Sequence, residues 1–169
     1  MTYPDSPGRP SARPFDGVRI DGDGFLLRAW RQDDLEALLR HADDPRVPRG
    51  LSDRFPHPYT RADGEDFLAG RVVDLAHPVL AIEIDGEACG GIAARPHAGE
   101  KAHSAELGYW LGSAHWGHGH MTRVVAAYLD WVVPVLALRR VEANVLDANP
   151  ASACVLQKNA FIEEGTRRA

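Results

Sequence analysis

Apolar and polar residues alternate over residues 105–111, AELGYWL, and this period of two predicts a strand with two different faces. Leu107, Tyr109 and Leu111 fall on one of these faces. Further along, apolar residues recur at helical spacing, at Met121, Val124, Val125, Tyr128 and Val132. The glycine- and histidine-rich segment 117–120 therefore lies between a strand and a helix and opens that helix.

The same patterns predict the remaining elements. Strands are expected over 25–30, 79–85, 88–96 and 139–146, with an Asp85-Gly86 turn between the second and the third. Helices are expected after Asp33-Asp34, from Thr60 through residue 74, and over 151–158 behind an Asn149-Pro150 start. Strands and helices mixed in this order indicate an α/β sheet. The proline-rich residues 1–16 predict a flexible tail, and residues 17–169 a single domain.

The loop at 117–120 has the chemistry of an anion site. Gly117 and Gly119 lack a Cβ, so their backbone can adopt left-handed conformations and approach a ligand closely. The first N–H groups of a helix have no internal partners, and they carry the positive end of its dipole. The chain has neither the G-x-x-x-x-G-K-[ST] loop nor the dinucleotide-binding G-x-G-x-x-G pattern, so the common nucleotide sites are disfavoured.

Composition and charge narrow the class of protein. The 169 residues are 44% hydrophobic and 25% charged, as in ordinary globular proteins. A net charge of −5 without a basic stripe argues against nucleic-acid binding. Apolar stretches are too short to span a membrane, and no signal-peptide pattern opens the chain. Cys89 and Cys154 have no motif spacing, so we expect two core thiols and a cytoplasmic protein.

Four blocks in order resemble the GNAT superfamily of N-acetyltransferases, in its RimJ/RimL-like branch. They are AELGYWL at 105–111, WGHGHMT at 116–122, RRVEANV at 139–145 and NPASACVLQKNAF at 149–161. The resemblance implies a mixed α/β, predominantly antiparallel central sheet in which two parallel strands splay apart and hold acyl-CoA between them. Acetyl-CoA, or another acyl-CoA, is then the expected co-substrate.

The resemblance also implies which residues bind the coenzyme. The backbone of the splayed strand would hold the pantetheine arm, the following loop the pyrophosphate, and the last helix the thiol end. The corresponding residues are Leu107, Tyr109, Trp110, Leu111, Trp116, Gly117, His118, Gly119, His120, Met121, Asn149 and Ser152. Met121 departs from the family pattern, which has a small residue at that position.

The implied reaction transfers an acyl group to a primary amine, and the amine must first lose a proton. Glu106, on the strand lining the cleft, is the leading candidate for the base, with a structural salt-bridged carboxylate as the alternative. Glu83 and Glu142 are the competing acids. Ser152 is expected near the departing thiol, and a backbone N–H of the strand near the carbonyl oxygen. Asn149 is equally expected to cap its helix.

Several other side chains have alternative interpretations. His115, His118 and His120 cluster in one loop but lack an acid or cysteine ligand at recognised spacing, so we predict no metal. The tryptophans at 110, 116 and 131 are expected to serve packing. His57 and Tyr59 lie in the segment that forms the acceptor wall in relatives, so they are substrate-side candidates.

The family fold continues beyond FIEEG at 161–165 into further strand, whereas this sequence ends at Ala169. Three explanations are open: a truncated sequence, cover supplied by a second chain, or a sixth strand shifted into the gap. An exposed strand edge favours a homodimer slightly.

The sequence therefore predicts an acyl-CoA-dependent N-acyltransferase that acts on a small-molecule amine or a protein N-terminal amine. The alternatives are a non-catalytic acyl-CoA-binding sensor of the same fold, and an unrelated phosphate-binding α/β protein.

Overall fold

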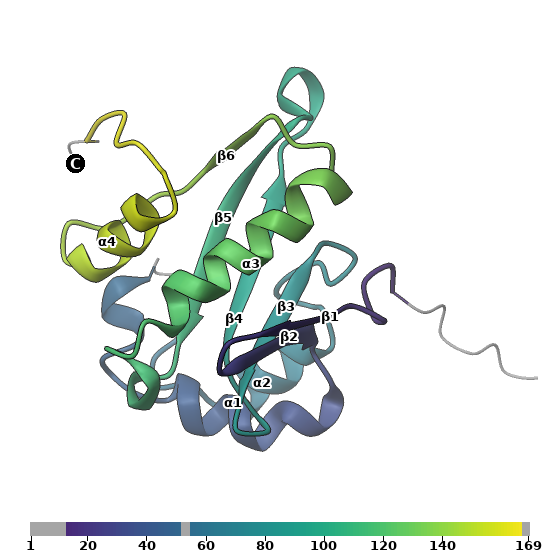
Figure 1. Ribbon diagram of the computed structural model, residues 1–169. Coiled ribbons are helices and arrows are strands. Elements are labelled where there is room, and N and C mark those ends of the chain that lie inside the picture. Colours follow the sequence, from purple (N-terminus) through teal and green to yellow (C-terminus); the bar gives the residue numbers. More distant parts are fainter. Residues whose placement is uncertain (1–12, 52–54, 167–169) are drawn as a thin grey trace, which may run out of the picture.

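The computed structural model describes residues 13–51 and 55–166 (Figure 1). The strands are β1 (Arg19–Gly22), β2 (Phe25–Ala29), β3 (Val79–Ile84), β4 (Glu87–Pro96), β5 (Ser104–Leu111) and β6 (Arg140–Glu142). The α-helices are α1 (Leu35–Ala42), α2 (Arg61–Leu68), α3 (His120–Val135) and α4 (Pro150–Lys158). Short 3-10 helices span Gln32–Asp34, Pro48–Gly50, Gly99–Lys101 and Ser113–His115. Residues 1–12 of the expected tail lie outside the described part.

The six strands form one sheet in the order β1-β2-β3-β4-β5-β6. Every neighbouring pair is antiparallel except β5 and β6, which run parallel. The parallel pair is joined through α3, as the crossover rule for parallel strands requires. The predicted mixed, predominantly antiparallel sheet is confirmed.

Each face of the sheet carries its own apolar cluster. Leu27, Ile82 and Leu107 belong to the cluster that packs against α3, whose Val125 and Tyr128 are fully buried. The cluster on the other face joins Trp30 and Ala81 to side chains of α1 and α2, such as Leu38 and Leu68. In Figure 1, α3 runs across the sheet and α4 lies beside it, at the end where β5 and β6 diverge.

Apart from shifts of one residue, the predicted elements differ from the structure at three places. The helix expected through residue 74 ends at Leu68, because Gly70 adopts a left-handed φ of 76° and the N–H of Arg71 donates back to the carbonyl of Asp66. The strand expected over 139–146 keeps only Arg140–Glu142. Residues 19–22 form a strand that the sequence reasoning did not predict, since it is short and mostly exposed.

The two cysteines have different environments. Cys89 is buried, as predicted, and burial raises the pKa of its thiol to about 12. Cys154 is exposed, so the prediction of a second core thiol was wrong. Its helix buries Leu156 against the core and leaves Cys154 on the solvent side.

Candidate active site

The parallel strands β5 and β6 stay together only briefly. They pair over Ser104–Glu106 and Arg140–Glu142, and beyond Glu106 strand β5 continues to Leu111 with β4 as its only partner among the described residues. The backbone N–H and C=O groups of residues 107–111 that point away from β4 therefore have no strand partner among the described residues, and Figure 1 shows β6 diverging from this edge. Such groups need partners, and an amide-containing ligand arm can supply them.

The glycine loop lies at the end of this strand and begins α3. Gly117 and Gly119 have φ values of 78° and 72°, so both use the left-handed conformation that glycine tolerates. Gly119 is the N-cap of α3 and has no side chain to accept from the first N–H groups of the helix. The helix start therefore offers its N–H groups and dipole to an anion.

Two side chains fix this loop. The indole N–H of Trp116 donates to the carbonyl of Leu111 at 2.8 Å, which ties the loop to the end of β5. Arg123 donates from Nη1 to the carbonyl of His118 at 3.2 Å and from Nε to the carbonyl of Asp23 at 3.1 Å. Trp116 is 45% exposed, so the expectation that it serves as a packing residue was wrong; its indole acts through a hydrogen bond at the surface.

Four imidazoles form a row from α1 to this loop. The ring centroids are 5.5 Å apart for His41 and His115, 6.4 Å for His115 and His120, and 6.0 Å for His118 and His120. Desolvation, followed by neighbouring cationic groups, holds the pKa values of His115 and His120 below the ordinary histidine value. Within residues 13–51 and 55–166, no group of three or more His, Cys, Asp or Glu side chains is arranged to hold a metal ion.

Glu106 lies where β5 and β6 separate, and its carboxylate is held from two sides. Asn144 Nδ2 donates to Oε1 at 2.9 Å, and Arg95, its cross-strand neighbour on β4, pairs with Oε2. These hydrogen bonds, that of Asn144 first, lower the pKa of Glu106, although partial burial opposes them. Glu106 is therefore ionised at neutral pH. Sequence reasoning missed both partners, because Arg95 becomes visible only through the β4–β5 register, and Asn144 only through the position of β6.

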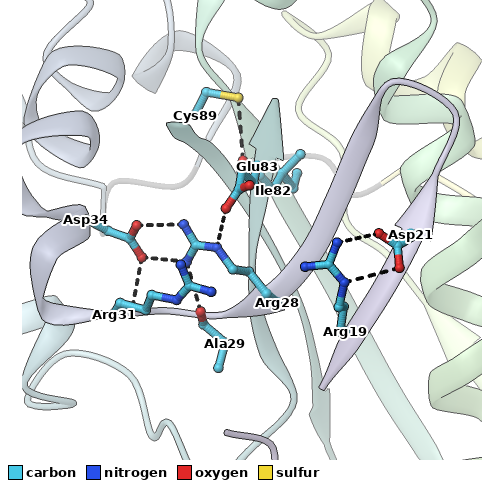
Figure 2. A network of polar contacts seen from close by, with 9 residues as sticks. All are labelled: Arg19, Asp21, Arg28, Ala29, Arg31, Asp34, Ile82, Glu83 and Cys89. Carbon is cyan, nitrogen blue, oxygen red and sulfur yellow. Dashed lines mark hydrogen bonds and ion pairs between the residues drawn. The ribbon is translucent and has the colours of Figure 1, made fainter. Parts of the chain in front are cut away.

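The two competing acids make structural contacts instead. Glu83 pairs with Arg28, whose guanidinium also binds both carboxylate oxygens of Asp34 at 2.7 and 2.8 Å (Figure 2). Arg28 and Asp34 are only 4% and 6% exposed, so this network ties β2 and β3 to the start of α1. Glu142 pairs with His97 at 3.1 Å and with Arg140 at 3.3 Å.

Two residues predicted separately for coenzyme binding contact each other. The hydroxyl of Tyr109 on β5 lies 2.8 Å from Oγ of Ser152 on α4, and burial raises the pKa of Tyr109. Asn149 caps α4 by accepting from the N–H of Ser152 at 3.1 Å, and its amide donates to the carbonyl of Gly50. The predicted capping role of Asn149 is confirmed. The Tyr109–Ser152 contact joins residues 43 apart in the chain, so spacing alone did not reveal it.

The two substrate-side candidates lie in different environments. Tyr59 is buried in the cluster on the α1 and α2 face, and burial raises the pKa of its hydroxyl to about 12. His57 is partly exposed, with Nδ1 3.9 Å from Oδ1 of Asp43. Asp43 also accepts from the backbone N–H of Tyr59 at 2.9 Å, so it connects the two residues.

Comparison with known proteins decides the family. The model of the acetyltransferase (GNAT) domain matches residues 25–162, which is most of the chain and includes every element of the site described above. The chain belongs to the GNAT family. The expected class of enzyme, an N-acyltransferase that moves an acyl group from an acyl-CoA to an amine, is thereby confirmed.

Individual GNAT relatives agree with this assignment. "Uncharacterized N-acetyltransferase p20" of Bacillus licheniformis is 26% identical over 149 residues, covering 85% of this chain and 82% of that protein. "Probable N-acetyltransferase YjcK" of Bacillus subtilis is 42% identical over 65 residues, which span 38% of this chain and only 36% of YjcK. The structure of Mycobacterium smegmatis RimJ in complex with CoA-disulfide has a TM-score of 0.73 at 26% identity, covering 88% of this chain and 76% of RimJ. The RimJ-like resemblance is therefore confirmed.

None of the helices that the structure describes in this GNAT protein has both the length and the apolar character needed to cross a membrane.

Proposed function

We propose that this GNAT protein transfers an acetyl group from acetyl-CoA to a primary amine at the point where β5 and β6 separate. The observation that carries the proposal is the single opening that joins three features: the unpaired edge of residues 107–111, the α3 N-terminus behind Gly119, and the Glu106 carboxylate. The coenzyme would supply the activated thioester. Its pantetheine arm fits the unpaired edge of β5, and its pyrophosphate fits the N–H groups at the start of α3.

Glu106 would remove the proton that the amine carries. An alkylammonium has a pKa of about 10, roughly 6 units above that of an ordinary glutamate, so direct transfer would be uphill by about 8 kcal/mol. The hydrogen bonds from Asn144 and Arg95 lower the carboxylate's pKa still further. We therefore assign Glu106 the role of attracting the ammonium and passing its proton to solvent water, rather than of keeping that proton.

Ser152 and Tyr109 would serve the leaving group. Attack of the neutral amine on the thioester carbonyl forms the C–N bond and breaks the C–S bond, so the thiolate of CoA then needs a proton or a hydrogen bond. The paired hydroxyls of Tyr109 and Ser152, 2.8 Å apart beside the opening, can donate one hydrogen bond outward while keeping the other between them.

The acceptor is a primary amine, either a small molecule or a protein N-terminus. Structural neighbours named as a ribosomal-protein-S5-alanine acetyltransferase and a spermidine N-acetyltransferase support keeping both kinds of acceptor in the proposal. The net charge of −5 favours encounter with cationic amines.

Release of thiol from acetyl-, propionyl- and succinyl-CoA in the presence of an amine panel tests the proposal. We expect amine-dependent thiol release with acetyl-CoA and an increase in melting temperature when acetyl-CoA alone is added. Thermal stabilisation without thiol release from any amine would favour the non-catalytic sensor. Absence of both effects would contradict acyl-CoA binding itself.

We also propose a cytoplasmic homodimer. The exposed, unpaired Cys154 suits a reducing compartment. Among the described residues β6 has no strand partner on its outer edge, and Leu146 and Ile162, which follow β6 in the chain, are 48% and 85% exposed. An open strand edge and exposed apolar side chains both favour aggregation, and a second copy of the chain could cover them. Gel filtration with light scattering should give twice the chain mass at micromolar concentration, and a monomer would contradict the dimer.

A further inference from the structure

On the face of β5 opposite α3, the surface that runs from Glu106 over the exposed Gly108 to Trp110 is open, and we call this surface the slot. Side chains alternate along the strand, so Glu106, Gly108 and Trp110 share one face. This is the face of α1 and α2, because Trp110 packs against their apolar cluster, whereas Leu107 and Leu111 belong to the cluster under α3. The cross-strand partner of Gly108 on β4 is Ala93, so small residues form the floor on both strands.

The space above Gly108 is open. A Cβ built on Gly108 would meet no described atom within 4 Å, and the residue is exposed. Its φ lies outside the left-handed range, so the strand does not need glycine for its backbone conformation. A glycine inside a strand has no side chain to pack, so it weakens the strand, and it often marks a place where a ligand approaches the backbone closely.

The two ends of the slot differ in chemistry. One end is the Glu106 carboxylate, held by Asn144 and Arg95. The other end is aromatic: the ring of Phe55 lies 5.4 Å from that of Trp110, centroid to centroid, and 5.3 Å from that of Tyr59. Glu106 and Trp110 are four residues apart on one strand, so their Cα atoms are about 13 Å apart at ~3.3 Å per residue. Between an anion and aromatic rings, this length suits an amine that carries one ring-sized apolar group.

We propose that the acceptor is a primary amine with a ring-sized apolar substituent, bound over Gly108 with its amine toward Glu106 and its substituent against Trp110 and Phe55. This assignment rests on the proposed function, since it names the substrate class of the same site. Gly108 then acts as a specificity-determining residue, because any side chain there occupies the space of the substituent.

A matched pair of amines tests the preference. We expect kcat/KM with acetyl-CoA to be at least ~10-fold higher for 2-phenylethylamine than for ethylamine, because only the first buries a ring in the slot. Spermidine represents the competing class of acceptors, the long polar amines. Equal kcat/KM for the two matched amines, or the highest value for spermidine, would overturn the inference while leaving the transferase activity established.

Substitution of Gly108 tests the location. Gly108→Leu should raise KM for 2-phenylethylamine at least ~10-fold while changing the acetyl-CoA Kd less than ~2-fold, and Gly108→Ala should act in the same direction more weakly. The smaller variant keeps the test valid if leucine disturbs folding. Gly17→Ala is the control, because Gly17 also has open space around it and lies before β1, at the far edge of the sheet.

The outcomes separate the two proposals. Unchanged kinetics in both Gly108 variants would contradict the proposal that the acceptor binds over Gly108. Absence of thiol release from every amine, with acetyl-CoA still raising the melting temperature, would overturn the proposed function and the slot with it.

Discussion

At the scale of single residues, Glu106 is the side chain whose substitution we expect to lower catalysis without weakening coenzyme binding. Gln keeps the shape of Glu106 and can still contact Asn144 and Arg95, but it carries no charge to attract an ammonium ion. We expect Glu106→Gln to lower kcat about 100-fold, within the usual range for losing an acid-base group, and to leave the acetyl-CoA Kd unchanged. Steady-state kinetics and calorimetry measure the two quantities.

Glu142 provides the control for that substitution. It is the register partner of Glu106 across the β5–β6 pair, but its carboxylate is engaged by His97 and Arg140. Glu142→Gln should leave kcat within a few-fold of the wild type. A loss as large as that of Glu106→Gln would remove the assignment of Glu106.

The Arg28 network predicts stability rather than activity. Asp34→Ala removes the carboxylate that binds Arg28 through two hydrogen bonds, and it leaves a buried guanidinium with Glu83 as its remaining acid partner. Breaking a buried pair in this way costs on the order of 3 kcal/mol of unfolding free energy. Urea denaturation should show this loss. The exposed Arg19–Asp21 pair, also drawn in Figure 2, is the control, because Asp21→Ala should hardly change stability.

At the scale of elements, the histidine row at the start of α3 predicts a pH dependence of coenzyme binding. Burial and nearby cations, including His118 and Arg123, keep His115 and His120 largely neutral at pH 7.5, although Asp85 opposes this effect. A phosphate beside these rings favours their charged form and raises their pKa values, so binding takes up protons. The Kd should therefore fall as pH decreases from 7.5, and level off below the pKa values of the unbound protein.

Calorimetry with dephospho-CoA between pH 5.5 and 8 measures this dependence without the titration of the coenzyme's own phosphate monoester, which has a pKa near ~6. A His115→Asn/His120→Asn variant should lose most of the pH dependence. An unchanged pH profile in that variant would show that the imidazoles do not contact the phosphates.

The elements that were predicted well are those whose signal is local. The alternation over 105–111 and the helical spacing from Met121 placed β5, the loop and α3 correctly, because period and glycine content are properties of adjacent residues. Strand β6 was predicted too long, since residues 143–146 have strand composition but no strand beside them after the sheet opens. Long-range contacts such as Tyr109–Ser152 and Arg95–Glu106 depend on register and topology, which periodicity does not encode.

At the scale of the whole molecule, the proposed sites place the two substrates on opposite faces of the sheet. The coenzyme would bind on the α3 face and at the α3 N-terminus, the acceptor would bind on the α1 and α2 face, and β5 would contribute to both sites. In this proposal, alternate residues of one strand serve different ligands. This arrangement explains why a short segment, 105–121, carries so much of the site.

The separation predicts independent effects of substitutions on the two faces. Gly119→Ala forces a left-handed alanine, which costs roughly 1–2 kcal/mol, and places its Cβ 3.0 Å from Nη1 of Arg123, so the acetyl-CoA Kd should rise about 10-fold or more. Gly108→Ala should raise the amine KM alone. Because Gly108 lies within β5 on the α1 and α2 face, whereas Gly119 caps α3, the two substitutions touch different elements and their effects should add in free energy. The double variant should then show the Kd of one single variant and the KM of the other. A further rise of the acetyl-CoA Kd in the double variant would mean that the slot over Gly108 belongs to the coenzyme.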